Sequence, residues 1–358
     1  MASYNLKEIF SKFDTSQSIS NHGDGHINDT YLATSNQKFI LQRINSDIFL
    51  SPEDVMNNIL LVTEHIRKRL AANGEDCKRG TLHVIPTLDG KPYYKTEDGS
   101  YFRMYDFIEN ATSYSKCDSA ETFYNSAKGF GRFFELLSDF DASLLSETIK
   151  NFHYTPWRYE ALCEAIEADK CGRVALAKPE IEFALARKDM TSVVTDYIAS
   201  GEIPLRVTHN DTKLNNIMLD DETNKPVCVI DLDTVMPGSI LYDFGDSIRF
   251  GASSAEEDEH DLDKVYCDMN LFDAFTRGFL EETGKFLTPK EKELLPFSAR
   301  LLTYECGIRF LTDYLNGDTY FKTHYEGQNL YRARTQLKLV ADMEEKDSIM
   351  NEIVKKYI

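Results

Sequence analysis

The stretch RVTHNDTKLNNIMLD, residues 206–220, is the part of the sequence that most constrains the fold. Its two ends are apolar enough for short strands, but the middle is almost entirely polar and has no apolar alternation. Polar groups in a core without hydrogen-bond partners are costly. A turn, DETNK, and a further apolar run, KPVCVIDLD, follow. We therefore expect a strand, a polar loop and then a short hairpin, with the loop side chains presented at one edge.

The spacing of the polar residues predicts chemistry for this loop. His209, Asp211 and Asn216 have the His-x-Asp-x-x-x-x-Asn spacing of a kinase catalytic loop. A carboxylate suits the base that orients a hydroxyl and accepts its proton late, and Asp211 has this position. Magnesium prefers hard oxygen ligands, which the Asn216 amide and the Asp231 carboxylate would provide.

Three further residues near the loop receive predicted roles. Asp233 follows Asp231 by two residues, so it would lie on the same side and hold a second metal ion if the strand geometry persists. Lys213 is close enough in sequence to Asp211 to offset charge on a transferred phosphoryl group. His209 is expected to hold the loop by hydrogen bonds rather than to take part in the reaction.

The distribution of strand and helix signals predicts an α+β fold with two lobes. Residues 1–110 are rich in short strand patterns and contain one marked helix, with Ser51 as N-cap, Pro52 at its first position and Gly74 as its stop. From about Ser119 the pattern is mainly helical. We expect a small antiparallel-sheet N-lobe with one helix, a hinge at about 103–110 and a larger, mainly α-helical C-lobe over 111–358.

Charge and composition restrict the partners. The chain has 358 residues, with 40 Lys and Arg against 59 Asp and Glu, a formal net charge of -19. This balance argues against nucleic acid and anionic membranes as partners. The N-terminal residues lack the apolar segment of a signal peptide, and no apolar run approaches the roughly 18 residues of a membrane span. Seven cysteines form no CxxC pair, so a cytoplasmic protein with reduced thiols is expected.

The N-terminal region offers weaker signals for nucleotide binding. GDGHIN has Gly23 and Gly25, with Asn28 where a third glycine would stand in G-x-G-x-x-G. Asn tolerates positive φ better than most residues, so a phosphate-covering turn is one interpretation and an ordinary hairpin turn is the other. The lysine expected on the following strand is missing, because KFILQRIN has Gln42 and Arg43 instead.

The segment FRMYDFIE has the apolar-then-acidic character of a hinge. Met104, Tyr105 and Phe107 would there flank an adenine. A plain core strand explains the same pattern equally well.

At the level of whole blocks, the sequence resembles the aminoglycoside phosphotransferase and choline kinase superfamily, and within it the N-acetylhexosamine 1-kinases. The resemblance is carried by GDGHIN, SDFDASLLSETI, PLRVTHNDTKLNNIMLD, VIDLDTVMPGSILYDFGDSIRFGAS and LLPFSARLLTYECGIRFLTDYLNGDTYF. It implies a protein-kinase-like fold and ATP- and Mg²⁺-dependent phosphorylation of the anomeric hydroxyl of N-acetylglucosamine or N-acetylgalactosamine. Asp211 would be the base, and Asn216 and Asp231 would bind magnesium.

The same resemblance implies sugar contacts. Glu305 and Arg309 are four residues apart on a predicted helix and so share a face. The expected partners are a small-molecule sugar and ATP, and no obligate protein partner is evident. The residues at the matching sugar-binding positions are His26, Asn210, Phe250, Arg309 and Tyr320.

Other functions remain open at this level. One fold serves many acceptors, so an aminoglycoside, choline, homoserine or methylthioribose kinase is an alternative. Choline would call for an aromatic cage and aminoglycosides for an acidic pocket, whereas Arg309 and Asn210 favour a neutral hydroxylated acceptor. The missing strand lysine alone supports a nucleotide-binding pseudokinase. No APE segment follows DLD, which argues against a protein kinase.

Overall fold

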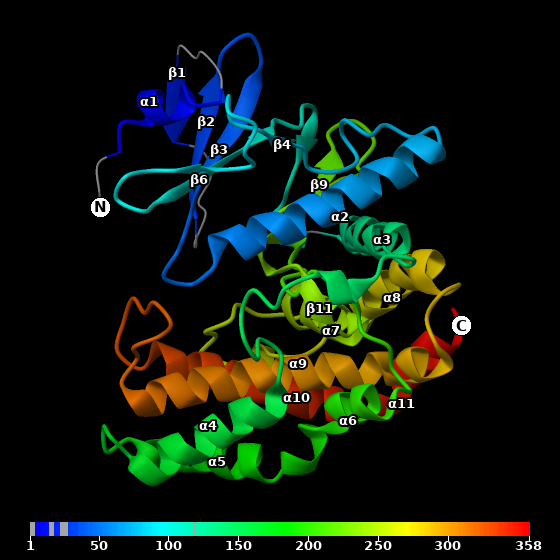
Figure 1. The fold of residues 1–358 in the computed structure, drawn as a ribbon. Helices are drawn as coiled ribbons and strands as arrows, with labels where there is room; N and C mark the ends of the chain where they lie inside the picture. The colour runs from blue at the N-terminus through cyan, green and yellow to red at the C-terminus, as the bar shows by residue number, and fades with distance from the viewer. Residues whose placement is uncertain (1–3, 14–17, 22–27, 118) are drawn as a thin grey trace.

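The N-terminal part of the molecule is an antiparallel sheet. The computed structural model describes residues 4–13, 18–21, 28–117 and 119–358. The strand order is β1-β2-β3-β6-β4, and β5 also pairs with β6. Figure 1 shows this sheet stacked above a larger helical region, which confirms the expected α+β fold with two lobes. The strands are β1 (Ser18–Asn21), β2 (Asp29–Thr34), β3 (Lys38–Ile44), β4 (Val84–Ile85), β5 (Tyr94–Lys95) and β6 (Tyr101–Asp106).

Two helices pack on the sheet. α1 (Leu6–Phe10) contributes to a small core on one face, together with alternate residues of β3 and β6 such as Leu41 and Met104. The predicted helix is confirmed as α2 (Pro52–Ala72), which crosses between the sheet and the helical region in Figure 1. Ser51 occupies its N-cap position without a side-chain capping bond.

The helical region is built around α9, a helix of 28 residues that begins with a capping box. α7 approaches α9 closely at Gly245, where a Cβ atom would lie 2.4 Å from the carbonyl oxygen of Ser298. Only glycine allows this approach. The helices are α3 (Ala120–Leu136), α4 (Thr155–Ala168), α5 (Lys178–Leu185), α6 (Val193–Ser200), α7 (Ile240–Gly251), α8 (Met269–Thr283), α9 (Pro289–Asn316), α10 (Gln328–Glu345) and α11 (Asp347–Lys355). Short 3-10 helices are η1 (Ala142–Leu144), η2 (Val174–Ala177), η3 (Lys188–Met190), η4 (Leu214–Asn216), η5 (Leu232–Thr234) and η6 (Leu262–Lys264).

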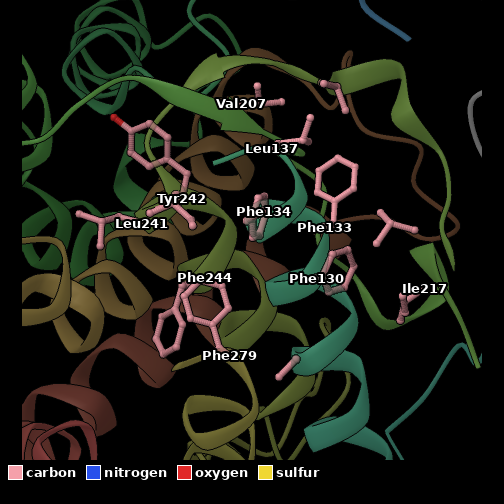
Figure 2. Packing of buried hydrophobic residues seen from close by; sticks show 14 of the residues in the cluster. Phe130, Phe133, Phe134, Leu137, Val207, Ile217, Leu241, Tyr242, Phe244 and Phe279 are labelled. Atoms are coloured by element: carbon pink, nitrogen blue, oxygen red, sulfur yellow. The ribbon is translucent and has the colours of Figure 1, made fainter. Parts of the chain in front are cut away.

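Phenylalanines of α3 form much of the core beneath the polar loop. Figure 2 shows Phe130, Phe133 and Phe134 on α3, and Phe244 of α7 beside Phe279 of α8, whose ring centroids are 5.2 Å apart. This core supports the polar loop from below, because the ring of His209 meets Phe130 edge-on at 5.7 Å.

The predicted hairpin is confirmed within the helical region. β9 (Ile217–Asp220) pairs antiparallel with β10 (Pro226–Val229), and β7 (Ala111–Thr112) adds to the other side of β9. β8 (Arg206–Thr208) pairs with β11 (Met236–Gly238), a strand that the sequence patterns did not indicate. The two pairs enclose the polar loop and the segment around Asp231. The lobe boundary at residue 110 stays a prediction.

Among the described residues, no helix combines the length and the apolar character needed to cross a bilayer.

Candidate active site

His209 holds the polar loop between β8 and η4. Its side chain is fully buried, and burial lowers its pKa. The ring Nδ1 accepts a hydrogen bond from the backbone N–H of Asp211 at 3.3 Å, and Nε2 donates to the carbonyl oxygen of Ile230 at 2.9 Å. This pattern requires a neutral imidazole. His209 therefore joins the loop to the segment that leads into Asp231.

Asp243, at the start of α7, fixes the same loop from the other side. Its carboxylate accepts the backbone N–H groups of His209 at 3.1 Å and Asn210 at 2.6 Å. Burial raises the pKa of Asp243 to about 7, although these two donors oppose the shift. Asn210 has a φ of 65°, the left-handed conformation that Asn tolerates best after glycine. The loop backbone is thus determined by two buried side chains.

Asp211, Lys213 and Asn216 form one hydrogen-bonded group. Lys213 Nζ lies 2.7 Å from Asp211 Oδ1, and Asn216 Nδ2 donates to Asp211 Oδ2 at 3.0 Å. Burial alone would lower the pKa of Lys213, but the charges of Asp211 and Asp246 outweigh it and raise that pKa. The Asp211 carboxylate is oriented on both oxygens, and Asn216 Oδ1 has no hydrogen-bond donor among the described residues.

Asp231 lies beside this group. The backbone N–H of Ile230 donates to the carbonyl oxygen of Asn216 at 2.9 Å, which places the start of the Asp231 segment against η4. Asp231 is exposed to solvent and has a φ of 58°. The pKa of Asp231 is raised, first because the surrounding protein limits the hydration of its carboxylate and then because Asp233 and Asp211 are negatively charged. The positive charges of Arg103 and Lys213 oppose this shift but do not cancel it. A bound cation would relieve this repulsion, so the donors fit a divalent metal ion.

The strand geometry on which the expectation for Asp233 depended is absent, because β10 ends at Val229 and η5 follows Asp231 directly. Asp233 is buried, and its Oδ1 accepts from Arg103 while its Oδ2 accepts from Asn28 Nδ2 at 2.6 Å. Its predicted role as a second metal ligand stays a prediction, and metal binding there would have to displace these two partners.

Of the nucleotide contacts predicted in GDGHIN, only Asn28 lies among the described residues. Gly23 and Gly25, with the sugar candidate His26, lie outside the described residues. Asn28 is buried and, besides bonding Asp233, accepts the backbone N–H of Asn45 at 3.0 Å, so it ties the end of this segment to the C-lobe.

In the predicted hinge, the side chains alternate between the two faces of β6. Met104 packs in the α1 core, whereas Tyr105 packs with the core on the α2 side. Phe107 is half-buried beneath Lys38, whose Nζ lies 5.1 Å from its ring centroid. The alternation sends Met104 and Tyr105 to opposite faces, so an adenine would meet at most one of the two side chains.

Two of the predicted sugar contacts line one pocket. Arg309 of α9 and Tyr320 border a pocket of about 190 Å³, together with Arg158 of α4. Tyr320 is 69% exposed, and its ring meets Phe321 edge-on at 4.8 Å. Phe250, at the end of α7, is 37% exposed and is not part of this lining.

Asn210 connects the polar loop indirectly to α9, which borders the pocket. Its Nδ2 donates to the carbonyl oxygen of Thr234 at 2.8 Å, and its own carbonyl oxygen accepts from His153 Nε2 at 3.3 Å. His153 Nδ1 in turn bonds Glu305 Oε1 at 2.8 Å, one turn of α9 before Arg309. His153 was not predicted from the sequence, because an isolated histidine in a loop carries no pattern.

Arg103 was also missed, although the sequence contained a signal. It is an arginine in the middle of the apolar strand YFRMYD, and it is 1% exposed. A charge at a buried strand position requires a partner from elsewhere in the chain. That partner, Asp233, lies 130 residues further on.

Comparison with known proteins shows the family of the chain. The profile of the phosphotransferase enzyme family APH matches residues 18–280, and the chain belongs to this family. An aminoglycoside phosphotransferase from Alicyclobacillus acidocaldarius superimposes with a TM-score of 0.63 at 12% identity, covering 99% of this chain and 98% of that chain.

Two further solved structures share the fold. A microcompartment-associated aminopropanol kinase gives a TM-score of 0.58 at 16% identity, covering 97% of this chain and 98% of that chain. An amicoumacin kinase, solved in complex with AMP-PNP and Ca²⁺, gives 0.59 at 14% identity, covering 94% of this chain and 93% of that chain.

Proposed function

We propose that this protein is an ATP- and Mg²⁺-dependent kinase that phosphorylates the anomeric hydroxyl of an N-acetylhexosamine, giving the sugar 1-phosphate and ADP. The observation that supports the proposal is the hydrogen bond between Asp211 and Asn216, with Asp231 near enough for the charge of Asp211 to raise its pKa. Membership of the phosphotransferase family and the AMP-PNP bound by a structural neighbour support ATP as the donor. The sequence resemblance supports the choice of acceptor.

Asp211 acts as the base. Its carboxylate accepts the proton of the acceptor hydroxyl as the hydroxyl oxygen attacks the γ-phosphorus, and the bond from that phosphorus to the β–γ bridging oxygen breaks to release ADP. Lys213, which pairs with Asp211 at 2.7 Å, can pair instead with the moving phosphoryl group and offset its negative charge. His209 and Asp243 keep the base in position through the loop backbone.

Asn216 Oδ1 and the Asp231 carboxylate would hold the magnesium ion. Within the described residues, no cluster of three or more His, Cys, Asp or Glu side chains is arranged to hold a metal. The remaining ligands would therefore be nucleotide oxygens and water, as is usual for magnesium at triphosphates. When bound, the ion neutralises charge on the β- and γ-phosphates.

The pocket bordered by Arg309 and Tyr320 favours a neutral acceptor. Arg158 and Arg309 both border it, and neither forms an ion pair with a described residue. The nearby Glu305 already bonds His153 and Thr155. Burial and the charge of Arg309 lower the pKa of Arg158 to about 10. Asp313 also borders the pocket, but its carboxylate already accepts the backbone N–H groups of Tyr320 and Phe321. Two guanidinium groups against this one carboxylate would disfavour cationic acceptors such as choline, whereas hydroxyl and acetamido oxygens accept hydrogen bonds from guanidinium groups. In the proposal, Arg309, Asn210, Tyr320, Phe250 and His26 contact the sugar.

A coupled ADP-release assay over a panel of acceptors tests the proposal. The panel contains N-acetylglucosamine, N-acetylgalactosamine, the parent hexoses, choline, an aminoglycoside, homoserine and methylthioribose. We expect turnover with an N-acetylhexosamine and a product with phosphorus on the anomeric oxygen by NMR. Turnover confined to another acceptor would replace the sugar assignment. Calorimetric binding of ADP without turnover of any acceptor would indicate a pseudokinase.

A further inference from the structure

The N-terminal sheet lacks a lysine at the position where protein kinases use one. In those enzymes a lysine on the third strand pairs with a glutamate of the following helix and reaches the nucleotide phosphates. Here β3 has Gln42, and Glu53 in the first turn of α2 accepts a hydrogen bond from Tyr101. A cation is nevertheless present one strand away, because Arg103 of β6 is the cross-strand neighbour of Gln42.

A row of side chains across three strands fixes the direction of this cation. Thr30 of β2, Gln42 of β3 and Arg103 of β6 are in register. Gln42 Nε2 donates to Thr30 Oγ1 at 3.1 Å, and Arg103 Nε and Nη2 both donate to Gln42 Oε1, at 3.1 and 2.9 Å. The guanidinium plane is therefore held by Gln42, with Nη1 left to point away from the sheet.

Nη1 of Arg103 reaches the C-lobe. It pairs with Asp233 Oδ1, and the two side chains are 1% and 3% exposed. Asn28, which precedes β2, donates to the other oxygen of Asp233 at 2.6 Å. One carboxylate of the C-lobe is thus held by two side chains of the N-lobe, and it lies two residues after Asp231.

We propose that Arg103 is the positioning residue that replaces the missing strand lysine, and that it acts through Asp233. The pair fixes the segment that carries Asp231 and places the N-lobe sheet over the nucleotide. Asp233 is then the charge partner of Arg103 and not the ligand of a second metal ion. The inference rests on the proposed function, because it assigns a role in nucleotide phosphoryl transfer.

Steady-state kinetics of Arg103→Met and Arg103→Lys test the role. We expect Arg103→Met to lower kcat at least 100-fold and to raise KM for ATP at least 10-fold, with KM for the acceptor changed less than threefold. Arg103→Lys should recover part of the loss, because lysine keeps the positive charge but lacks the planar set of N–H donors of the guanidinium group. Equal changes in both KM values, or an unchanged kcat in a folded Arg103→Met variant, would overturn the proposal.

Arg43→Met is the matched control. Arg43 follows Gln42 on β3 but forms a partly exposed pair with Asp29 at 2.7 Å. Its kinetic constants should stay within twofold of the wild type.

Moving the cation back to β3 is a rescue test. The variant Gln42→Lys/Arg103→Met should recover at least 10-fold of the kcat lost in Arg103→Met. A folded double variant no better than Arg103→Met would contradict the proposal. If Arg103→Met does not fold, the split between the two KM values in Arg103→Lys decides in its place: a rise confined to KM for ATP supports the role, and equal rises contradict it.

Two binding measurements separate this inference from the choice of acceptor. Calorimetric titration with Mg²⁺ and ADP should show at least 10-fold weaker binding to Arg103→Met and unchanged binding to Arg43→Met, whichever acceptor is used. Equal affinities would overturn the inference while leaving the acceptor question open. Titration of Asp233→Asn with Mn²⁺ in the presence of ADP should give the wild-type number of bound ions, and loss of one ion would show that Asp233 is a metal ligand.

Discussion

Two ion pairs flank Asp231, and their surroundings are opposite. In the Lys213–Asp211 pair the side chains are 35% and 22% exposed, whereas in the Arg103–Asp233 pair they are 1% and 3% exposed. The first pair keeps part of its hydration, so exchanging partners during a reaction costs less than it would for a fully buried pair. The second pair has given up its hydration, so separating it would leave unpaired buried charges. The comparison assigns the partly hydrated pair to the proposed chemistry and the dry pair to architecture.

The largest expected effect is on the solvated side. Asp211→Asn should lower kcat by about 10³-fold, because the amide cannot accept the hydroxyl proton. The ADP-release assay measures this loss. Asp221→Asn, an acidic position in the nearby hairpin turn that accepts from Thr112, is the control and should be unaffected. A loss of less than tenfold in Asp211→Asn would mean that Asp211 is not the base.

The next prediction compares the stability contributions of the two pairs. Asp233→Ala leaves Arg103 buried without its counter-charge and should lower the free energy of unfolding by about 3–5 kcal/mol. Lys213→Ala should lower it by less than about 1 kcal/mol, because Asp211 remains hydrated. Urea unfolding of both variants measures the difference. Similar losses in the two variants would break the distinction between a dry and a solvated pair.

A third ion pair, His153–Glu305, is also buried and extends the comparison to pH. Burial alone would lower the pKa of His153, but the carboxylate of Glu305 outweighs burial and raises it. Burial alone would raise the pKa of Glu305, but His153 outweighs burial and lowers it. The stability that protonated His153 contributes is complete below its ordinary pKa of 6.5 and is lost as pH rises through the raised pKa. The stability that ionised Glu305 contributes is complete above its ordinary pKa of 4.5 and is lost as pH falls through the lowered pKa.

Glu305→Gln should therefore be less stable than the wild type by about 2 kcal/mol between the ordinary pKa values of 4.5 and 6.5. The difference should shrink in alkaline buffer. Unfolding free energies measured across pH 5 to about 9 test this, since the ordinary histidine pKa lies inside that range. A difference that does not change with pH would show that His153 is neutral throughout.

The smallest expected effect concerns the acceptor pocket. Arg309→Met should raise KM for the acceptor by about 10-fold with kcat nearly unchanged, because it removes a hydrogen bond made equally in the ground and transition states. Arg334→Met is the control, since Arg334 bonds Glu180 at 2.7 Å and is not part of the pocket lining. A fall in kcat without a change in KM would place Arg309 nearer to the reacting atoms than proposed.

Local patterns made much of the fold predictable. The signals around Ser51 and Gly74 identified α2, and the turn DETNK identified the hairpin of β9 and β10. The spacing of His209, Asp211 and Asn216 predicted residues that the structure joins by hydrogen bonds. These features are determined by neighbours in sequence, and periodicity and spacing report on such neighbours.

The contacts between distant segments were not predictable in the same way. Alternation in VIDLD predicted a continuing strand through Asp231 and Asp233, but the backbone is left-handed at Asp231 and η5 follows. The partner of Asp233, Arg103, lies 130 residues away, and no local pattern records it. The strand β11 was missed for a similar reason, since its three residues pair only with the distant β8.

Residues of the N-terminal part of the chain bind the segment after Asp231 at two positions, Asp233 and Val235. Besides the Arg103–Asp233 pair, Asn58 of α2 donates to the carbonyl oxygen of Val235 at 2.9 Å. Asn28 adds a further bond to Asp233 from the same side. The residues from 233 to 235 are therefore tied to the N-terminal sheet and α2 as well as to the helical region. Any displacement of that sheet must carry these residues with it or separate a buried ion pair.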